Sequence, residues 1–263
     1  MEVDDDDADE SYYRVRIGNC VKYLEIAPAT LERDALSFPL TFLPPLPFDG
    51  DWSVAHISRD GTSGELKTSL SHRQLAAVQN VWHSAHINVL DLKRTEQLSG
   101  AVFEALLPDA AFPGTAPHQP SDRITDIAKI ARFGWEIPYI ERETRAYQVL
   151  VQKQASRLAP RFLGHIHEEG RVKKLEGRRS ASVDDLPDCE RALGEFHELG
   201  LLHGDVNRYN FLVGGDGVKL IDLERFQEDA SVDSRTKEIQ SLRAQLVDES
   251  GKGGGFIFRD SEE

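Results

Sequence analysis

One segment near the end of this 263-residue chain constrains its fold more than any other. The sequence HGDVNRYNFLV occupies positions 203–213, and KLIDLE follows at 219–224 after a Gly-Asp-Gly turn. This order predicts a loop, a strand, a tight hairpin and a second strand that ends in an acidic residue. We therefore expect Asp205, Asn210 and Asp222 to converge from separate turns.

Each polar side chain of this segment has a task that suits its chemistry. Asp205 is placed to accept or orient the proton of an acceptor hydroxyl, as a general base on a rigid loop. Asn210 and Asp222 present oxygen ligands for Mg²⁺, which bridges the oxygens of a triphosphate. His203 is expected to hydrogen-bond within the loop and hold its shape. The alternative, incidental polar residues at strand ends, requires the spacing, the apolar strand and the second acid to coincide.

A lysine upstream needs an acidic partner. Lys129 lies in the middle of the sequence IAKIA, a poor environment for a charge unless something pairs with it. In the helix expected to begin at Pro138, Glu143 falls on the apolar stripe, whereas Glu141 falls on the opposite side. We therefore predict that Lys129 pairs with Glu143. A surface lysine and a solvated glutamate would leave the apolar flanks of Lys129 unexplained.

The rest of the chain shows alternating strand and helix patterns without an internal repeat. The segment 37–52 is too rich in Pro and Gly for a helix, and its aromatic residues, such as Phe48 and Trp52, are expected to be buried anchors. The other expected elements are a strand or hairpin over 12–25, two strands over 86–108, a surface loop over 109–122, a strand over 124–134, a helix over 139–152, a strand over 161–170 and a helix over 186–200.

The HGD sequence, the asparagine five residues after its aspartate and the later IDLE together resemble the protein-kinase-like superfamily, in its aminoglycoside-phosphotransferase-like branch. The sequences WEIPYIERETRAY and APRFLGHIHEEGRV are also similar to fungal kinase-like proteins. The resemblance implies ATP held between two lobes, with Asp205 as catalytic base and Mg²⁺ at Asn210 and Asp222. It also implies that Lys129, positioned by Glu143, contacts the α- and β-phosphates.

The resemblance covers about residues 88–245 and implies an α+β fold with two lobes. The N-lobe would hold a small antiparallel sheet, and the C-lobe would be short and mostly helical. The expected domains are an acidic disordered tail over 1–11, an N-terminal extension packed on the N-lobe over 12–86, the N-lobe over 87–176, the C-lobe over 177–250 and a flexible tail over 251–263.

Three features depart from the protein-kinase pattern. Gly204 stands where protein kinases have arginine, so coupling to a phosphorylated activation loop is absent. Leu223-Glu224 replaces Phe-Gly, which resembles small-molecule kinases. The strand leading to the hinge should be an apolar run of about 5–6 residues, but RVKKLEGRR at 171–179 is mostly charged. Either this strand is degenerate or the sequence lacks a segment, and a catalytically impaired pseudokinase or binding module is therefore the alternative.

Charge and composition limit the partners. The formal net charge is −14, and seven acidic residues lie among the first ten. The absence of a basic excess argues against nucleic-acid and anionic-membrane binding. No apolar run approaches the roughly 18 residues that span a bilayer, and Cys20 and Cys189 are too few for a disulfide framework. We expect a cytoplasmic phosphotransferase that moves the γ-phosphoryl group of ATP to a hydroxyl acceptor, protein or small molecule.

Two histidine pairs offer weaker metal sites. His165 and His167, followed by two glutamates, lie two residues apart and would share one strand face, but an ordinary alternating strand accounts for them more simply. His83 and His86 have helical spacing, yet no cysteine or carboxylate lies near them in the sequence. We expect structural roles for all four.

Overall fold

The computed structural model describes residues 10–18, 20–31, 43–73, 77–98, 101–106, 125–167, 172–173 and 179–248. Within these residues the protein is mixed α+β, with three α-helices and sheets in which antiparallel pairing predominates. The chain divides into two compact units, Met1–Leu75 and Ala76–Glu263. The tail expected at 251–263, the loop expected at 109–122 and most of the acidic tail lie outside the described residues.

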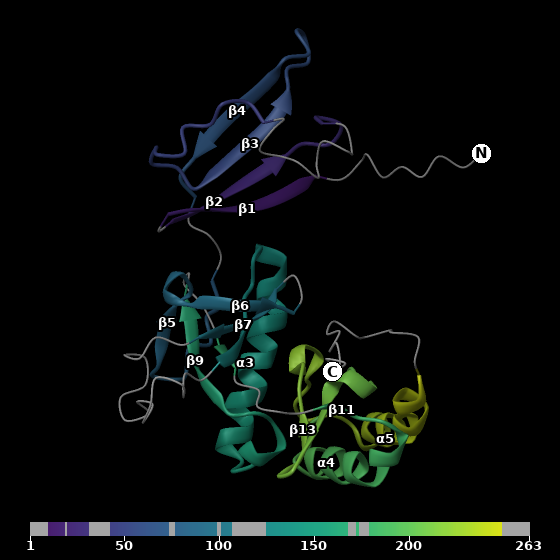
Figure 1. Ribbon diagram of the computed structural model, residues 1–263. Helices are drawn as coiled ribbons and strands as arrows, with labels where there is room; N and C mark the ends of the chain where they lie inside the picture. Colours follow the sequence, from purple (N-terminus) through teal and green to yellow (C-terminus); the bar gives the residue numbers. More distant parts are fainter. Residues whose placement is uncertain are drawn as a thin grey trace, which may run out of the picture. The chain divides into compact units, whose positions relative to one another are not determined.

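The first unit contains one twisted sheet (Figure 1). Its first two strands form the hairpin expected over 12–25, the second and third pair in parallel, and the third and fourth pair antiparallel. In sheet order the strands are β1 (Ser11–Ile17), β2 (Cys20–Ile26), β3 (Val54–Arg59) and β4 (Leu66–Ser71).

The described end of the connection between β2 and β3, residues 43–53, packs aromatic residues on one face of this sheet. Trp52 is buried against Leu24, and Phe48 packs on the same cluster, as expected. The Trp52 indole N–H donates to the Pro47 carbonyl oxygen (2.7 Å), and the Lys22 ammonium lies 4.3 Å from the Trp52 ring. These contacts fix an irregular segment without regular secondary structure, because its Pro and Gly content excludes a helix.

The second unit begins with a larger sheet of mostly antiparallel strands. The pair β5–β9 is parallel, and β6 and β7 form the hairpin expected within 86–108. In sheet order the strands are β5 (His86–Asn88), β9 (Phe162–His167), β10 (Val172–Lys173), β8 (Thr125–Lys129), β7 (Val102–Leu106) and β6 (Lys93–Gln97). The strand expected over 124–134 ends earlier than expected, at Lys129.

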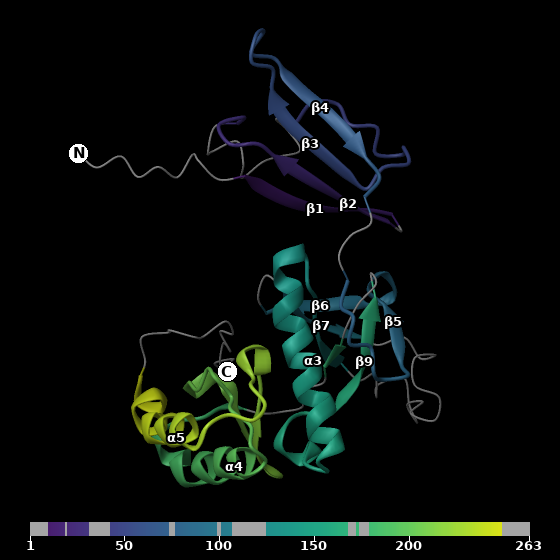
Figure 2. The same cartoon turned by 180° about the vertical axis from the view of Figure 1, so that it is seen from behind.

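Helix α3 (Ile137–Gln152) runs along this sheet in both views (Figures 1 and 2). Pro138 lies in its first turn, where a missing N–H costs nothing. The apolar stripe that the sequence predicts is buried and includes Ile140, Tyr147 and Leu150. Glu143 lies on this buried face, so the helix brings one carboxylate into the interior.

The rest of the unit combines two helices with a small sheet, in which β12 lies between β11 and β13. Cys189, Phe196, Phe211 and Leu242 are fully buried in its core. The elements are β11 (Arg179–Ser180), α4 (Leu186–Glu198), β12 (Phe211–Gly214), β13 (Gly217–Leu220) and α5 (Val232–Val247). Single 3₁₀ turns are η2 (Val89–Asp91), η4 (Gly134–Glu136), η5 (Ser156–Leu158), η6 (Val183–Asp185), η7 (Arg208–Asn210) and η8 (Leu223–Arg225).

Helix α5 is an element that the sequence patterns above do not predict. It begins at the cap Ser231, whose hydroxyl accepts from the Ser234 N–H (3.0 Å). Its buried residues are Leu242 and Leu246, one helical turn apart. Such a short apolar stripe is a weak signal in a sequence. No helix in the described part of the chain has the length and apolar character needed to cross a membrane.

Candidate active site

The loop between α4 and β12 has a backbone that requires glycine at position 204. Gly204 has φ +80°, and a Cβ there would lie 2.4 Å from the Arg225 carbonyl oxygen. His203 is fully buried; its Nε2 lies 2.9 Å from the Ile221 carbonyl oxygen, and its Nδ1 accepts from the Asp205 N–H (3.3 Å). These bonds place the ring proton on Nε2, and they give His203 the loop-holding role that its position predicts.

Hydrogen bonds connect Asn210 to Asp205 on one side and to Ile221, the residue before Asp222, on the other. The Asn210 side-chain amide donates to the Asp205 carbonyl oxygen (2.8 Å), which leaves the amide oxygen of Asn210 as its ligand atom. The Ile221 N–H donates to the Asn210 carbonyl oxygen (3.0 Å). Asp222 follows directly in a left-handed conformation (φ 58°, ψ 53°), which a residue other than glycine adopts only at a cost. The loop and the end of β13 are therefore held together at this point.

Lys129 and Asp222 meet across the unit, 93 positions apart in the sequence. The Lys129 Nζ lies 2.5 Å from Asp222 Oδ1, 2.5 Å from Glu224 Oε1 and 3.2 Å from Glu143 Oε2. The pair expected between Lys129 and Glu143 is therefore present. Glu143 Oε1 also accepts from the Leu223 N–H (3.3 Å), so α3, β8 and the turn η8 share one buried ion cluster.

Glu141, the glutamate set aside in favour of Glu143, lies away from this cluster. Its carboxylate accepts from the Gln79 backbone N–H (2.6 Å). Helical periodicity alone distinguished the two acids, because residues two positions apart on a helix face different directions.

The cluster carries more negative than positive charge. Burial lowers the pKa of Lys129, but the carboxylates of Glu143, Asp222 and Glu224 outweigh it and raise the pKa above its ordinary value. Burial raises the pKa of Glu224, and the Asp222 charge adds to this effect while Lys129 opposes it. One carboxylate oxygen from each of the three acids lies within 4.8 Å of the others. Three carboxylates facing one ammonium suit a hard divalent cation such as Mg²⁺.

Glu224 is a site residue that the sequence patterns above do not single out as functional. The turn η8 directs its side chain back toward Lys129. Helix α3 fixes this turn, because the Arg142 Nε donates to the Glu224 carbonyl oxygen (2.8 Å). Arg145 holds the following segment through two bonds to the Glu228 carboxylate (2.7 and 2.9 Å). The signal in the sequence is the acid two residues after Asp222.

Glu238 is a second residue that only the structure identifies. Its carboxylate, contributed by α5, accepts from the Gly204 N–H (2.7 Å) and the His203 N–H (3.2 Å) and lies 2.7 Å from His197 Nε2. Burial alone would raise the pKa of Glu238, but its hydrogen bonds to His197 and to the loop amides outweigh burial and lower it. Helix α5 thereby holds the backbone of the loop that carries Asp205.

No protein-family model matches the chain, and a search of curated proteins found none similar to it. The functional argument therefore rests on the geometry of the site.

The histidine pairs have structural roles where they are described. His165 is buried, and its Nε2 accepts from the backbone N–H groups of Trp82 and His83 (both 3.2 Å). His83 Nδ1 accepts from the Ala85 N–H (3.1 Å). The His167 side chain and the two glutamates after it lie outside the described residues.

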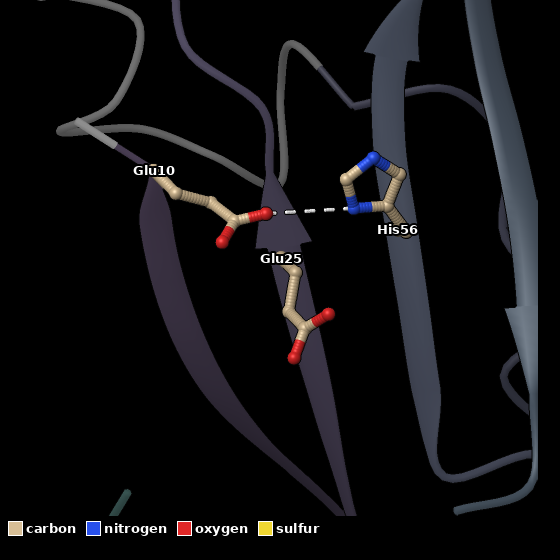
Figure 3. A group of neighbouring side chains, drawn as sticks. All are labelled: Glu10, Glu25 and His56. Atoms are coloured by element: carbon tan, nitrogen blue, oxygen red, sulfur yellow. Dashed lines mark ion pairs between the residues drawn. The ribbon is translucent and has the colours of Figure 1, made fainter. Parts of the chain in front are cut away.

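A separate group of two acids and a histidine lies in the first unit (Figure 3). His56 Nδ1 is 3.6 Å from Glu10 Oε1, and Figure 3 shows Glu25 below this pair. Each acid has another protein partner, because Glu10 accepts from the Tyr12 hydroxyl and Glu25 pairs with Arg73. These side chains form an ion-paired surface patch.

Proposed function

We propose that this protein is an ATP- and Mg²⁺-dependent phosphotransferase with a two-lobed, kinase-like fold, which transfers the γ-phosphoryl group to a hydroxyl acceptor. The observation that carries the proposal is the meeting of Lys129, from the sheet, with Asp222, from the end of β13 (2.5 Å). A largely buried lysine, held by an acid on the neighbouring helix and by an acid just after a strand, is an arrangement that binds triphosphate and metal.

One group of residues would bind the phosphates and the metal ion, and Asp205 would handle the proton. Lys129, held by Glu143, would neutralise phosphate charge once phosphate oxygens replace its carboxylate partners. Asn210 and Asp222 supply the oxygen ligands for Mg²⁺, and Glu224 adds a third candidate ligand. Mg²⁺, when bound, would offset the negative charge that develops on the transferred group.

Asp205 would orient the acceptor hydroxyl and take its proton. Its backbone is held on both sides, because its N–H donates to His203 (3.3 Å) and its carbonyl accepts from Asn210 (2.8 Å). Gly204 and Glu238 hold the preceding backbone, so the carboxylate projects from a rigid turn. A fixed base lowers the barrier because its orientation is set before the acceptor binds.

A catalytically impaired binding module is the second candidate, and one contact favours it. Glu224 Oε1 lies 2.5 Å from Lys129 Nζ, the atom that a phosphate oxygen would contact. The side chain of Glu224 therefore competes with phosphate for the same ammonium. The mostly charged sequence RVKKLEGRR at 171–179, most of which lies outside the described residues, is a second feature in favour of this candidate.

The two candidates differ in their response to Mg²⁺-ATP. We expect millimolar Mg²⁺-ATP to raise the unfolding temperature of the wild-type protein by mass action. Asp222→Asn should lose this shift, whereas Asp205→Asn should keep it and lose phosphoryl transfer by roughly 100-fold or more. The matched control is Asp233→Asn, an exposed acid paired with Lys237 on α5.

The outcomes separate the candidates as follows. An unfolding temperature that does not respond to Mg²⁺-ATP refutes nucleotide binding and with it the phosphotransferase. A shift without phosphate transfer to any of a panel of hydroxyl-bearing metabolites and proteins supports the binding module. Loss of both binding and transfer in Asp205→Asn contradicts the assignment of the base.

A further inference from the structure

A cavity of about 570 Å³ lies beside the C-terminal half of α3, on a part of that helix other than the turn that carries Glu143. It is bordered by α3, by the segment from η5 to the start of β9, and by side chains of the β12–β13 hairpin. Cavities of about 300–1,000 Å³ are typical of small-molecule sites. All of its lining residues belong to the second unit, and the proposed phosphotransferase site does not use this cavity.

Aromatic rings form the inner wall of this cavity. The ring centroids of Trp82 and Phe162 are 4.9 Å apart at 31°, and those of Tyr147 and Phe162 are 5.4 Å apart at 42°. The Trp82 indole N–H donates to the Thr144 carbonyl oxygen (3.1 Å), which fixes the orientation of that ring. A wall of pre-positioned, tilted rings favours a flat aromatic ligand, because little side-chain entropy is lost on binding.

The rim of the cavity carries an excess of positive charge. Arg161 is exposed there, and Lys219 pairs with Asp216 (3.2 Å) while donating to the Arg157 carbonyl oxygen (2.7 Å). Burial and the nearby charges of Arg161 and His86 lower the pKa of His83, which disfavours a second positive charge beside Arg161. With Lys219 and Asp216 offsetting each other, Arg161 supplies the net charge that a ligand meets.

An apolar side chain lies at the edge of the cavity. Val151, on the last turn of α3, is 48% exposed and lines the cavity together with buried Leu150. A single kind of ligand can contact all three features, which are the aromatic wall, the apolar edge and the cationic rim.

We propose that this cavity binds a small planar aromatic anion, with its ring system against Trp82, Phe162 and Tyr147 and its carboxylate paired with Arg161. The guanidinium of arginine presents paired N–H donors that match a carboxylate, which explains the preference for an acid over a neutral amide. This proposal is independent of phosphotransferase activity, because it concerns binding at a different group of residues.

The probe for this site is 2-naphthoate, with 2-naphthamide as its uncharged counterpart. Calorimetric titration of the full chain should give a dissociation constant below about 1 mM for the anion and about tenfold weaker binding for the amide. Arg161→Ala should weaken 2-naphthoate binding by about fivefold or more and leave the amide within about twofold. The matched control is Arg191→Ala, which removes an exposed arginine of α4 that pairs with Asp188.

A second variant tests the position of the ring system without removing a core residue. Ser156 lines the cavity from an exposed position, so Ser156→Trp should fill part of the space and abolish binding of both probes. An unchanged unfolding temperature of Ser156→Trp would show that the fold is intact. If this variant does not fold, the Arg161→Ala comparison decides the proposal.

Three results would overturn the proposal. These are the absence of 2-naphthoate binding at millimolar concentration, equal affinity for the acid and the amide, and displacement of 2-naphthoate by Mg²⁺-ATP. The last result would place the probe in the phosphotransferase site instead, and it would leave the proposed function standing.

Discussion

Removal of the Glu238 carboxylate should loosen the loop that carries Asp205. The carboxylate makes hydrogen bonds to the Gly204 and His203 N–H groups and to His197, and it is almost fully buried. Hydrogen bonds to a charged group contribute about 1.5–3 kcal/mol each, but their losses do not simply add. Since breaking a buried charged pair costs about 3–5 kcal/mol, we expect Glu238→Ala to destabilise the protein by that amount.

The isosteric variant separates charge from packing. Glu238→Gln keeps one acceptor oxygen but presents an NH₂ group where a second acceptor is needed. We therefore expect Glu238→Gln to lower the free energy of unfolding by less than Glu238→Ala does, by about 1.5–3 kcal/mol, which corresponds to one lost charge-assisted hydrogen bond. Glu190→Ala, an exposed position on α4, is the control and should stay within about 0.5 kcal/mol of the wild type.

Urea unfolding followed by circular dichroism at 222 nm provides the assay. The α-helices among the described residues all lie in the second unit, so this signal reports the unit that contains Glu238. Because the pKa of Glu238 is lowered by folding, its stabilisation is present above the ordinary glutamate pKa and is lost as the pH falls through the folded-state value. The gap between wild type and Glu238→Gln should therefore narrow as the pH is lowered from about 5 to about 3. A cost of Glu238→Ala below about 1 kcal/mol at pH 7, or a gap that does not depend on pH, would refute this account of the loop.

Three further predictions concern the same site. Gly204→Ala should destabilise the protein by at least about 2 kcal/mol, because Gly204 has a positive φ and the added Cβ would meet a nearby carbonyl oxygen. Gly194→Ala, in α4 with open space around it, should instead stabilise the protein by about 0.5–1 kcal/mol. Equal effects of the two substitutions in denaturant titrations would contradict the loop geometry. Glu224→Gln should raise the unfolding temperature at pH 7 and have no effect near pH 4, since burial raises the pKa of this acid and its ionised form is disfavoured in the folded protein. A lower unfolding temperature of the variant at pH 7 would contradict this prediction. Lys129→Met should destabilise the protein by about 3–5 kcal/mol, because it leaves three buried or half-buried acids without their ammonium partner. The presence of 10 mM Mg²⁺ should stabilise this variant more than the wild type. The same response to Mg²⁺ in both proteins would argue against a cation site.

Local patterns were sufficient to predict the pair formed by Lys129 and Glu143. The choice of Glu143 over Glu141 needed only the helical period, because the buried stripe of α3 is continuous from Ile140 to Leu150, about three turns. The hairpin of β12 and β13 was predictable for a similar reason, since a Gly-rich turn between two apolar strands specifies its own geometry, but β13 ends at Leu220, two residues before the expected end at Asp222. His203 was assigned its loop-holding role from its place at the start of the HGDVNRYN segment, and the hydrogen bonds agree.

These sequence patterns could not predict the long-range contacts. Helix α5 buries only Leu242 and Leu246, so its apolar periodicity is weak, and it owes its place to packing on α4. Glu238 could not be assigned from the sequence, because its partner Gly204 lies 34 positions away.

The sequence by itself determined the spacing of the three residues proposed to carry the chemistry, because Asp205, Asn210 and Asp222 lie along one loop and the hairpin that follows it. Only the tertiary structure decided what surrounds them: Glu224, which is a third acid on Lys129 beside Glu143 and Asp222, and helix α5, which holds the loop backbone. The physical reason is that local periodicity specifies the direction of a side chain from its own helix or strand. Which elements then meet depends on the packing of the whole core, and no short stretch of sequence encodes that.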